Sequence, residues 1–151
     1  YTVNKYNLIE NLLKSLKEEP FRRRHIMNMY QENDLNDNPG LYPCAYETIW
    51  SVRKTNNKLY LDMTLIQRSN DYIVAGYINK IQYVALMMMV ASHLGYDVGK
   101  FCHYVHNLHI YDRHIDAAKT LLEREPLSIQ PSIKENIYGI KKLDYDLEIA
   151  V

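Results

Sequence analysis

One long apolar segment, residues 79–94, limits the folds open to this chain more than any other part of the sequence. It contains neither glycine nor proline and ends at Gly95, a residue type that often terminates helices. Its longest apolar run, residues 83–91, is about half of the roughly 20 residues that a membrane span requires. We therefore predict a buried central helix.

Strand-like segments lie before and after this helix. Residues 46–53 and 58–67 flank Thr55-Asn56-Asn57, which is a hairpin signal. Further strands are predicted over residues 25–30 and 100–108. The sequence thus predicts an α+β fold in which a mixed β-sheet packs against the long central helix.

Helices and loops complete the expected pattern. Apolar residues at helical spacing predict an amphipathic helix over residues 6–16 and another helix over residues 112–124. Residues 31–40 and 68–71 are polar and are predicted as loops. After Pro126 the pattern is weak until a short apolar tail at residues 147–151.

The composition excludes several classes of protein. The chain has 151 residues, enough for one domain with a hydrophobic core. Basic and acidic residues number 18 each, so no net field favours RNA or an anionic membrane. Two cysteines cannot form a disulfide framework, which favours a reducing cytoplasm. We expect no secretory leader, and because the chain begins with Tyr1 we expect an N-terminal part to be missing.

Cys44 is the first candidate for chemistry. It follows Pro43 in a predicted loop between strands, where a thiol could be an exposed nucleophile. The alternative is a small buried hydrophobe, which is the commoner role of free cysteine. Cys102, inside an apolar strand, is assigned that structural role.

Two polar clusters are further candidates. Residues 67–71, Gln-Arg-Ser-Asn-Asp, combine a forked donor and a hydroxyl that would suit a phosphate, although a solvated turn has the same composition. In a strand, His109 and Tyr111 would point to the same side and could bind a sugar hydroxyl, or could be satisfied in the core. His106, His109 and His114 lack partners at a zinc-like spacing, so no metal site is predicted.

The order and spacing of these motifs resemble the thymidylate synthase family from about residue 6 to residue 131. Enzymes of this family methylate dUMP at C5 to give dTMP, and 5,10-methylenetetrahydrofolate supplies both the carbon and the hydride. The resemblance implies a symmetric homodimer with a sheet face as its interface. It rests on Arg23-Arg24, Pro43-Cys44, Gln67-Arg68-Ser69, Asp71, Asn79, His109-Ile110-Tyr111 and Arg124-Glu125-Pro126.

The resemblance assigns a role to each matching residue. Cys44 matches the nucleophile, whose thiolate adds to C6 of the pyrimidine, and Arg68 would supply the positive charge that a thiolate needs. Arg68 and Ser69 would hold the 5′-phosphate, which Arg23 and Arg24 would reach from the partner subunit. The predicted catalytic residues are Cys44, Arg68, Asn79 and Asp71, and Gln67 joins the expected dUMP site.

Base, sugar and folate have their own expected partners. The amide of Asn79 would accept from uracil N3–H and donate to O4, while His109 and Tyr111 would bind the ribose 3′-hydroxyl. Asp71, Ile78, Ala150 and Val151 are expected to contact the folate, the last two in a tail that closes over it.

Departures from the family pattern set the alternatives. Ala45 stands where many members have histidine, and Tyr77 and Ile78 replace a proline and a folate-facing aromatic residue. The expected catalytic glutamate and folate-stacking tryptophans would lie upstream of this sequence, and residues 132–146 are shorter than the family leads us to expect, so residues 1–151 are taken as one incomplete domain. The alternatives are a pyrimidine hydroxymethylase, against whose dCMP-specific form Asn79 argues, and a non-enzymatic nucleotide-binding or RNA-binding domain.

Overall fold

The computed structural model describes residues 2–3, 6–30, 42–128, 132–133 and 149–150. A four-stranded sheet forms its centre, with the order β3 (Ile26–Asn28), β4 (Ala45–Thr55), β5 (Lys58–Asp71) and β6 (Asp97–His109). The first three strands are antiparallel neighbours and β6 runs parallel to β5, so the sheet is mixed, as predicted. Asn56 and Asn57, both with positive φ, make the two-residue turn between β4 and β5.

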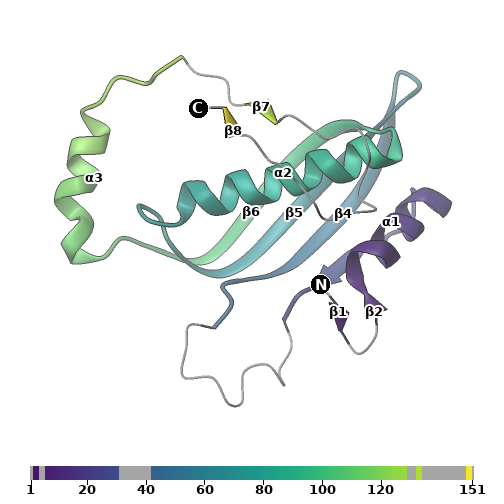
Figure 1. Ribbon diagram of the computed structural model, residues 1–151, viewed down its shortest axis with the longest axis horizontal. Coiled ribbons are helices and arrows are strands. Elements are labelled where there is room, and N and C mark those ends of the chain that lie inside the picture. Colours follow the sequence, from purple (N-terminus) through teal and green to yellow (C-terminus); the bar gives the residue numbers. More distant parts are fainter. Residues whose placement is uncertain (1, 4–5, 31–41, 129–131, 134–148, 151) are drawn as a thin grey trace.

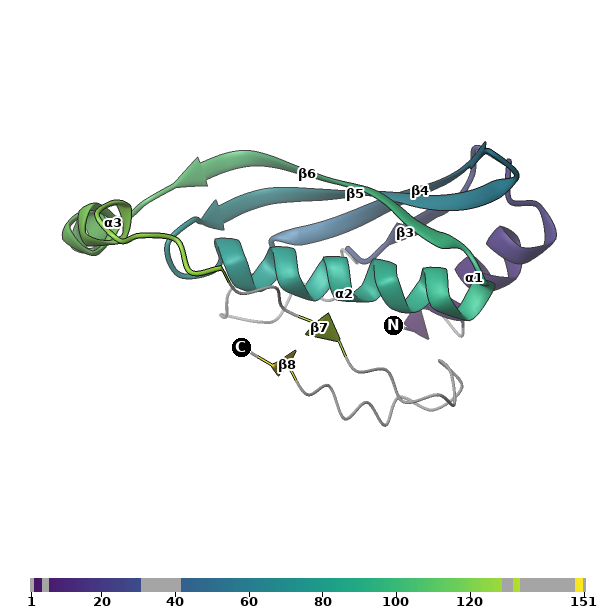
Figure 2. The same cartoon turned by 90° about the horizontal axis from the view of Figure 1, so that it is seen from above.

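The predicted central helix is α2 (Gly76–Leu94), which lies along one face of the sheet (Figures 1 and 2). It is the crossover that parallel strands such as β5 and β6 require. It ends where Gly95 takes a left-handed conformation with φ of 69°. A second helix, α1 (Leu8–Glu18), begins at Asn7, whose side-chain oxygen accepts a hydrogen bond of 3.2 Å from the backbone nitrogen of Glu10.

The hydrophobic core lies between the two helices and the inner face of the sheet. Side chains alternate along β4 and β5, so every second residue is buried against the helices. Tyr96, just after α2, donates a hydrogen bond of 2.9 Å from its hydroxyl to the carbonyl of Leu16 and so ties α1 to this layer. The fully or almost fully buried side chains include Leu12, Leu16, Trp50, Leu61, Met63, Leu65, Met87 and Val90.

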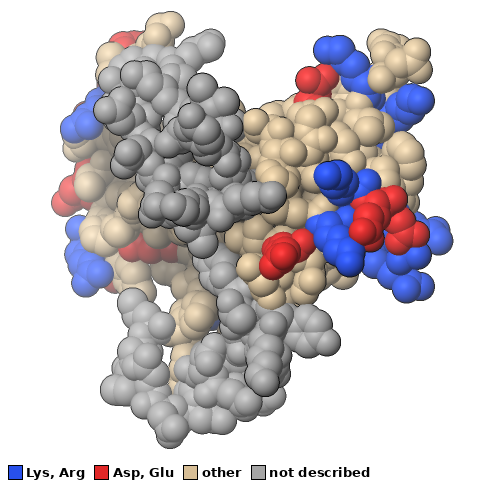
Figure 3. All heavy atoms as spheres, turned by 45° about the vertical axis from the view of Figure 1, so that its right-hand side comes forward, with Lys and Arg blue, Asp and Glu red and all other residues tan. Residues whose placement is uncertain are grey.

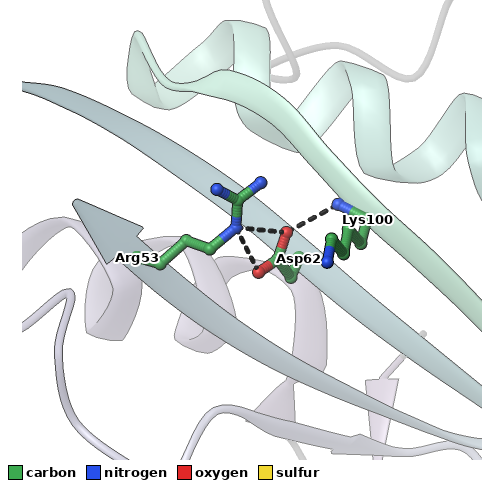
Figure 4. A network of polar contacts seen from close by, with 3 residues as sticks. All are labelled: Arg53, Asp62 and Lys100. Atoms are coloured by element: carbon green, nitrogen blue, oxygen red, sulfur yellow. Dashed lines mark hydrogen bonds and ion pairs between the residues drawn. The ribbon is translucent and has the colours of Figure 1, made fainter. Parts of the chain in front are cut away.

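Asp62 joins three strands on the opposite face of the sheet (Figure 4). Its Oδ2 lies 2.9 Å from Nε of Arg53 on β4, and its Oδ1 accepts a hydrogen bond of 2.6 Å from the backbone nitrogen of Lys100 on β6. The ladder between β5 and β6 shifts register here. The carboxylate therefore accepts a hydrogen bond from a backbone nitrogen at an irregular point of the sheet. Gly99 leaves room for it, because a Cβ at that position would collide with the Asp62 carboxylate.

Several predicted boundaries were wrong. Residues 68–71, predicted as a loop, continue β5, because β6 pairs with the strand as far as Asp71, opposite His109. The predicted helix over residues 112–124 is a short 3-10 turn, η2 (Asp112–His114), followed by α3 (Ile115–Leu122). Its first turn is tighter than an α-helix, and the α-helix proper is short.

Two small strand pairs were not predicted. β1 (Thr2–Val3) pairs with β2 (Tyr6–Asn7), so the helix expected from residue 6 begins two residues later. β7 (Ser132–Ile133) pairs with β8 (Ile149–Ala150). The loop predicted over residues 31–40, most of the segment 132–146 and Val151 lie outside the described residues.

One face of the sheet is covered and the other is open. Both α1 and α2 lie on the same side, and no described helix covers the opposite side (Figure 2). That open face carries partly exposed apolar side chains, among them Ile49 and Tyr104. None of the described helices combines the length and the apolarity that crossing a bilayer requires.

Candidate active site

Cys44 and Arg68 are held together where β4 begins and β5 ends. The backbone nitrogen of Arg68 donates to the carbonyl of Cys44 at 2.8 Å. The Arg68 guanidinium donates from Nη2 to the carbonyl of Tyr42 at 2.9 Å and from Nε to that of Pro43 at 3.1 Å. The half-buried Cys44 Sγ lies 3.8 Å from the Tyr42 carbonyl oxygen. A cation and a partly accessible thiol thus share the same short backbone segment, residues 42–44.

A network of side-chain amides lies next to this pair. Gln67 is opposite Ala45 in the ladder, so it lies one residue from Cys44. Its Nε2 donates to Asn79 Oδ1 at 3.1 Å, and Asn70 Nδ2 donates to the same oxygen at 3.0 Å. Asn79 comes from the first turn of α2, because the end of β5 runs almost directly into that helix. The structure therefore brings Cys44, Arg68, Gln67 and Asn79 close together, and their roles in a site stay predictions.

His103 on β6 extends the network. Its Nε2 lies 2.8 Å from Gln67 Oε1. Burial lowers the pKa of His103, and the nearby Lys80 cation lowers it further. The ring is therefore neutral at physiological pH.

The second part of the site lies at the ends of β5 and β6. It is formed by Asp71, His109 and Tyr111. Asp71 pairs with His109 in the ladder, and the backbone nitrogen of Tyr72 donates to the His109 carbonyl at 2.9 Å. The His109 and Tyr111 rings meet edge to face with centroids 5.0 Å apart. Asp71 Oδ2 lies 3.4 Å from His114 Nδ1, which is a close ion-pair distance but longer than a good hydrogen bond. Ser69, opposite Asn107 on β6, lies between the two parts.

A pocket of about 320 Å³ opens beside this constellation. Asn70, Tyr72, Gly76, Lys80 and His103 contribute to its wall. The Lys80 ammonium lies 4.8 Å from the centroid of the Tyr72 ring, a cation–π arrangement. The wall therefore combines an amide, a neutral imidazole and a cation with aromatic surface.

Arg23 and Arg24 do not join the site within one chain. Both are exposed and lie just before β3, whose Ile26 pairs with Ile49 on β4. Ile49 is five residues from Cys44 along the strand, and the two arginines lie beyond it. At about 3.4 Å per residue, they are more than about 17 Å from the thiol.

The expected folate residues differ in exposure: the side chain of Asp71 is only 15% exposed, whereas Ile78 is open to solvent. Ile78 is exposed on the first turn of α2, and the exposed ring of Tyr77 lies 5.9 Å from that of Tyr72. Ala150 belongs to β8, but its side chain and all of Val151 lie outside what the structure describes.

Sequence reasoning missed Asn70 and His103. Asn70 was predicted only as part of a polar segment, and His103 was not predicted as a site residue. Both side chains belong to the hydrogen-bond network around Gln67 and Asn79. The available signal was the alternation along β6, which places His103 between Phe101 and Val105 on the half-buried side of the strand.

Charge is mixed over the described surface. On the face shown in Figure 3, Lys and Arg side chains lie beside Asp and Glu side chains, and no broad field of one sign covers the described part of that face. Among the described residues, no group of three or more His, Cys, Asp or Glu side chains is placed to hold a metal ion.

Fold and site together define a class of protein: a mixed-sheet α+β domain in which a half-buried thiol and an arginine lie beside a network of side-chain amides. A family model described as thymidylate synthase matches residues 1–149. The chain belongs to the thymidylate synthase family.

Similar proteins agree with this assignment. The chain is 46% identical over 151 residues to a thymidylate synthase of Streptococcus agalactiae and 44% identical over 151 residues to one of Streptococcus pneumoniae. Each comparison covers 96% of this chain and 54% of the relative, so the chain spans about half the length of these proteins. The structure of thermostable thymidylate synthase A from Bacillus subtilis is similar with a TM-score of 0.73 and 35% identity, covering 88% of this chain and 46% of that one.

Proposed function

We propose that the protein containing this chain is a thymidylate synthase that converts dUMP to dTMP with 5,10-methylenetetrahydrofolate. The observation that carries the proposal is the pairing of Cys44 with Arg68, whose guanidinium is fixed on the two carbonyls before the thiol. The thiol is half-buried rather than fully enclosed, as a nucleophile that meets a ligand must be. Two free cysteines in the chain suit a reducing cytoplasm.

The Cys44 thiolate would add to C6 of the pyrimidine and shift an electron pair towards C5. C5 would then bond to the folate one-carbon unit and lose its proton, and the bond from that carbon to the folate nitrogen would break, leaving an exocyclic methylene group on the pyrimidine. Hydride from the folate reduces that carbon to a methyl group as the Cys44–C6 bond breaks, leaving dTMP and dihydrofolate. Arg68 and Ser69 would hold the phosphate, His109 and Tyr111 the ribose, and Asn79 the base.

The same proposal includes a symmetric homodimer. The open face of the sheet, with exposed apolar residues such as Ile49 and Tyr104, is a surface that a second copy would cover. Arg23 and Arg24, too far from Cys44 in their own chain, would complete the phosphate site of the partner. Asp71 and Ile78 would contact the folate.

Release of tritium from C5 of labelled dUMP tests the proposal in full-length protein. We expect release that depends on the folate, formation of dihydrofolate, and loss of both in Cys44→Ser. A product heavier than dTMP by one oxygen atom would identify a hydroxymethylase instead. Tight dUMP binding with no release from the full-length protein would identify a non-enzymatic nucleotide-binding protein.

A further inference from the structure

A backbone carbonyl fixes the direction of hydrogen bonding around Asn79. Gln67 Nε2 lies 2.9 Å from the carbonyl oxygen of Ser69. A carbonyl oxygen can only accept, so the end of the Gln67 side chain that faces Ser69 is its NH2 group. The same NH2 group lies 3.1 Å from the Asn79 side chain, so the atom that faces it is the acceptor, Oδ1. The orientation of Asn79 in the unmodified protein thus depends on which way the Gln67 amide is held.

The other partners of the network agree with this direction. Asn70 Nδ2 is a second donor to Asn79 Oδ1, at 3.0 Å. At the far end, Gln67 Oε1 is an acceptor 2.8 Å from His103 Nε2, so the neutral His103 ring carries its proton on Nε2. Hydrogen bonds therefore run from His103 to Gln67 to Asn79, and from Asn70 to Asn79.

The buried side chain of Asn70 is only partly satisfied. Its side chain is buried, with 2% of the residue exposed, and its Oδ1 has no hydrogen-bond partner among the described residues. A buried amide oxygen without a partner is unfavourable. Its NH2 group is nevertheless directed at Asn79, so the explanation to look for is a role in holding that side chain.

The network determines what Asn79 can offer to a ligand. Gln67 and Asn70 both donate to Asn79 Oδ1, so they hold the amide with its oxygen towards them. No described residue accepts a hydrogen bond from Asn79 Nδ2, so the side chain presents a donor. Uracil has a carbonyl acceptor at C4, whereas cytosine has an amino donor there. If Asn79 Nδ2 is directed at C4, it can donate to the carbonyl oxygen of uracil. With cytosine it would face the amino group, which is also a donor, so binding of uracil is favoured.

We propose that Asn70 and His103 are positioning residues that set the preference for uracil over cytosine by holding Asn79 with Nδ2 towards the base. The inference rests on the proposed function, since it takes the pyrimidine to bind at Asn79.

Two substitutions at one position test this in the full-length protein. Asn70→Leu removes the donor with little change in volume, and Asn70→Asp replaces it by an acceptor facing Asn79 Oδ1, which favours turning the amide over. The quantity to measure is the ratio of kcat/KM for dUMP to that for dCMP, together with the ratio of the two dissociation constants by calorimetry. We expect the ratio to fall by about tenfold in the leucine variant, the size of one lost hydrogen bond, and further in the aspartate variant.

A purely structural role would give a different result. It would lower both kcat/KM values together and leave their ratio unchanged in both variants, which would overturn the inference. Nitrogen NMR of His103 in the unmodified protein provides a test that needs no variant to fold: a proton on Nε2 supports the network, and a proton on Nδ1 overturns it. Selective dUMP binding without tritium release would defeat the proposed function alone, whereas turnover with an unchanged ratio would defeat this inference alone.

Discussion

Arg68 donates a hydrogen bond of 3.1 Å from Nε to the carbonyl of Pro43, the residue directly before Cys44. With the second bond, to Tyr42, the guanidinium spans two consecutive carbonyls in a way that a single ammonium cannot. The position of the thiol relative to the cation therefore depends on a forked side chain.

Arg68→Lys should keep the charge and lose this geometry. We expect kcat/KM for dUMP to fall by about a hundredfold, because a small displacement of reacting groups costs that much. Steady-state tritium release from labelled dUMP measures it. Arg22→Lys, just after α1, is the matched control and should stay within about twofold, because a lysine can keep the exposed pair with Glu19. Equal losses in both variants would mean that Arg68 has no special role.

Gly99→Ala should destabilise the fold. A Cβ at Gly99 would lie 2.6 Å from the carbonyl oxygen of Leu61 and would also collide with the Asp62 carboxylate, which must then release the backbone nitrogen of Lys100. We expect a loss of about 1–3 kcal/mol in the free energy of unfolding, measured by urea denaturation. In Lys100→Ala the backbone nitrogen that makes the bond is retained, so the loss should stay within about 0.5 kcal/mol.

Tyr96→Phe should loosen α1 from the sheet. The hydroxyl donates to the carbonyl of Leu16, and burial raises the pKa of Tyr96, so the group stays protonated as a donor. Removing it should cost about 1 kcal/mol of unfolding free energy. Amide hydrogen exchange should quicken in α1 more than in α2. Uniform acceleration in both helices would show that the contact does not hold α1 specifically.

Stability should depend on pH through His103. Its pKa is lowered in the folded protein from 6.5, so the unfolded chain binds the proton more readily. The contribution is fully present above pH 6.5 and is lost as the pH falls below that value. His103→Gln keeps a donor for Gln67 but cannot take up a proton. Its melting temperature should therefore fall less on acidification than that of the unmodified protein. Identical pH profiles of the melting temperature would contradict this.

The sequence predicted the elements better than their ends. The central helix, the hairpin and the mixed sheet followed from the apolar pattern of α2, β4 and β5. The strand character of residues 68–71 could not be predicted, because their polar composition resembles a loop and only the pairing with β6 shows otherwise.

Much of the site was also predictable, because motif spacing marked Cys44, Arg68 and Asn79. The part played by Asn70 and His103 was not, since it depends on which side chains three separate elements bring within hydrogen-bond distance. The separation of Arg23 and Arg24 from Cys44 is likewise a consequence of the register between β3 and β4.

The most direct test of the central claim is the intact mass of the full-length protein after incubation with 5-fluoro-dUMP and 5,10-methylenetetrahydrofolate. Fluorine at C5 cannot leave as a proton does, so the reaction should stop with nucleotide and folate both bound covalently. We predict a mass increase equal to the sum of nucleotide and folate, located on the peptide that contains Cys44 and absent in Cys44→Ser. An unchanged mass, or an adduct that persists in Cys44→Ser, would contradict the assignment of Cys44 as the nucleophile.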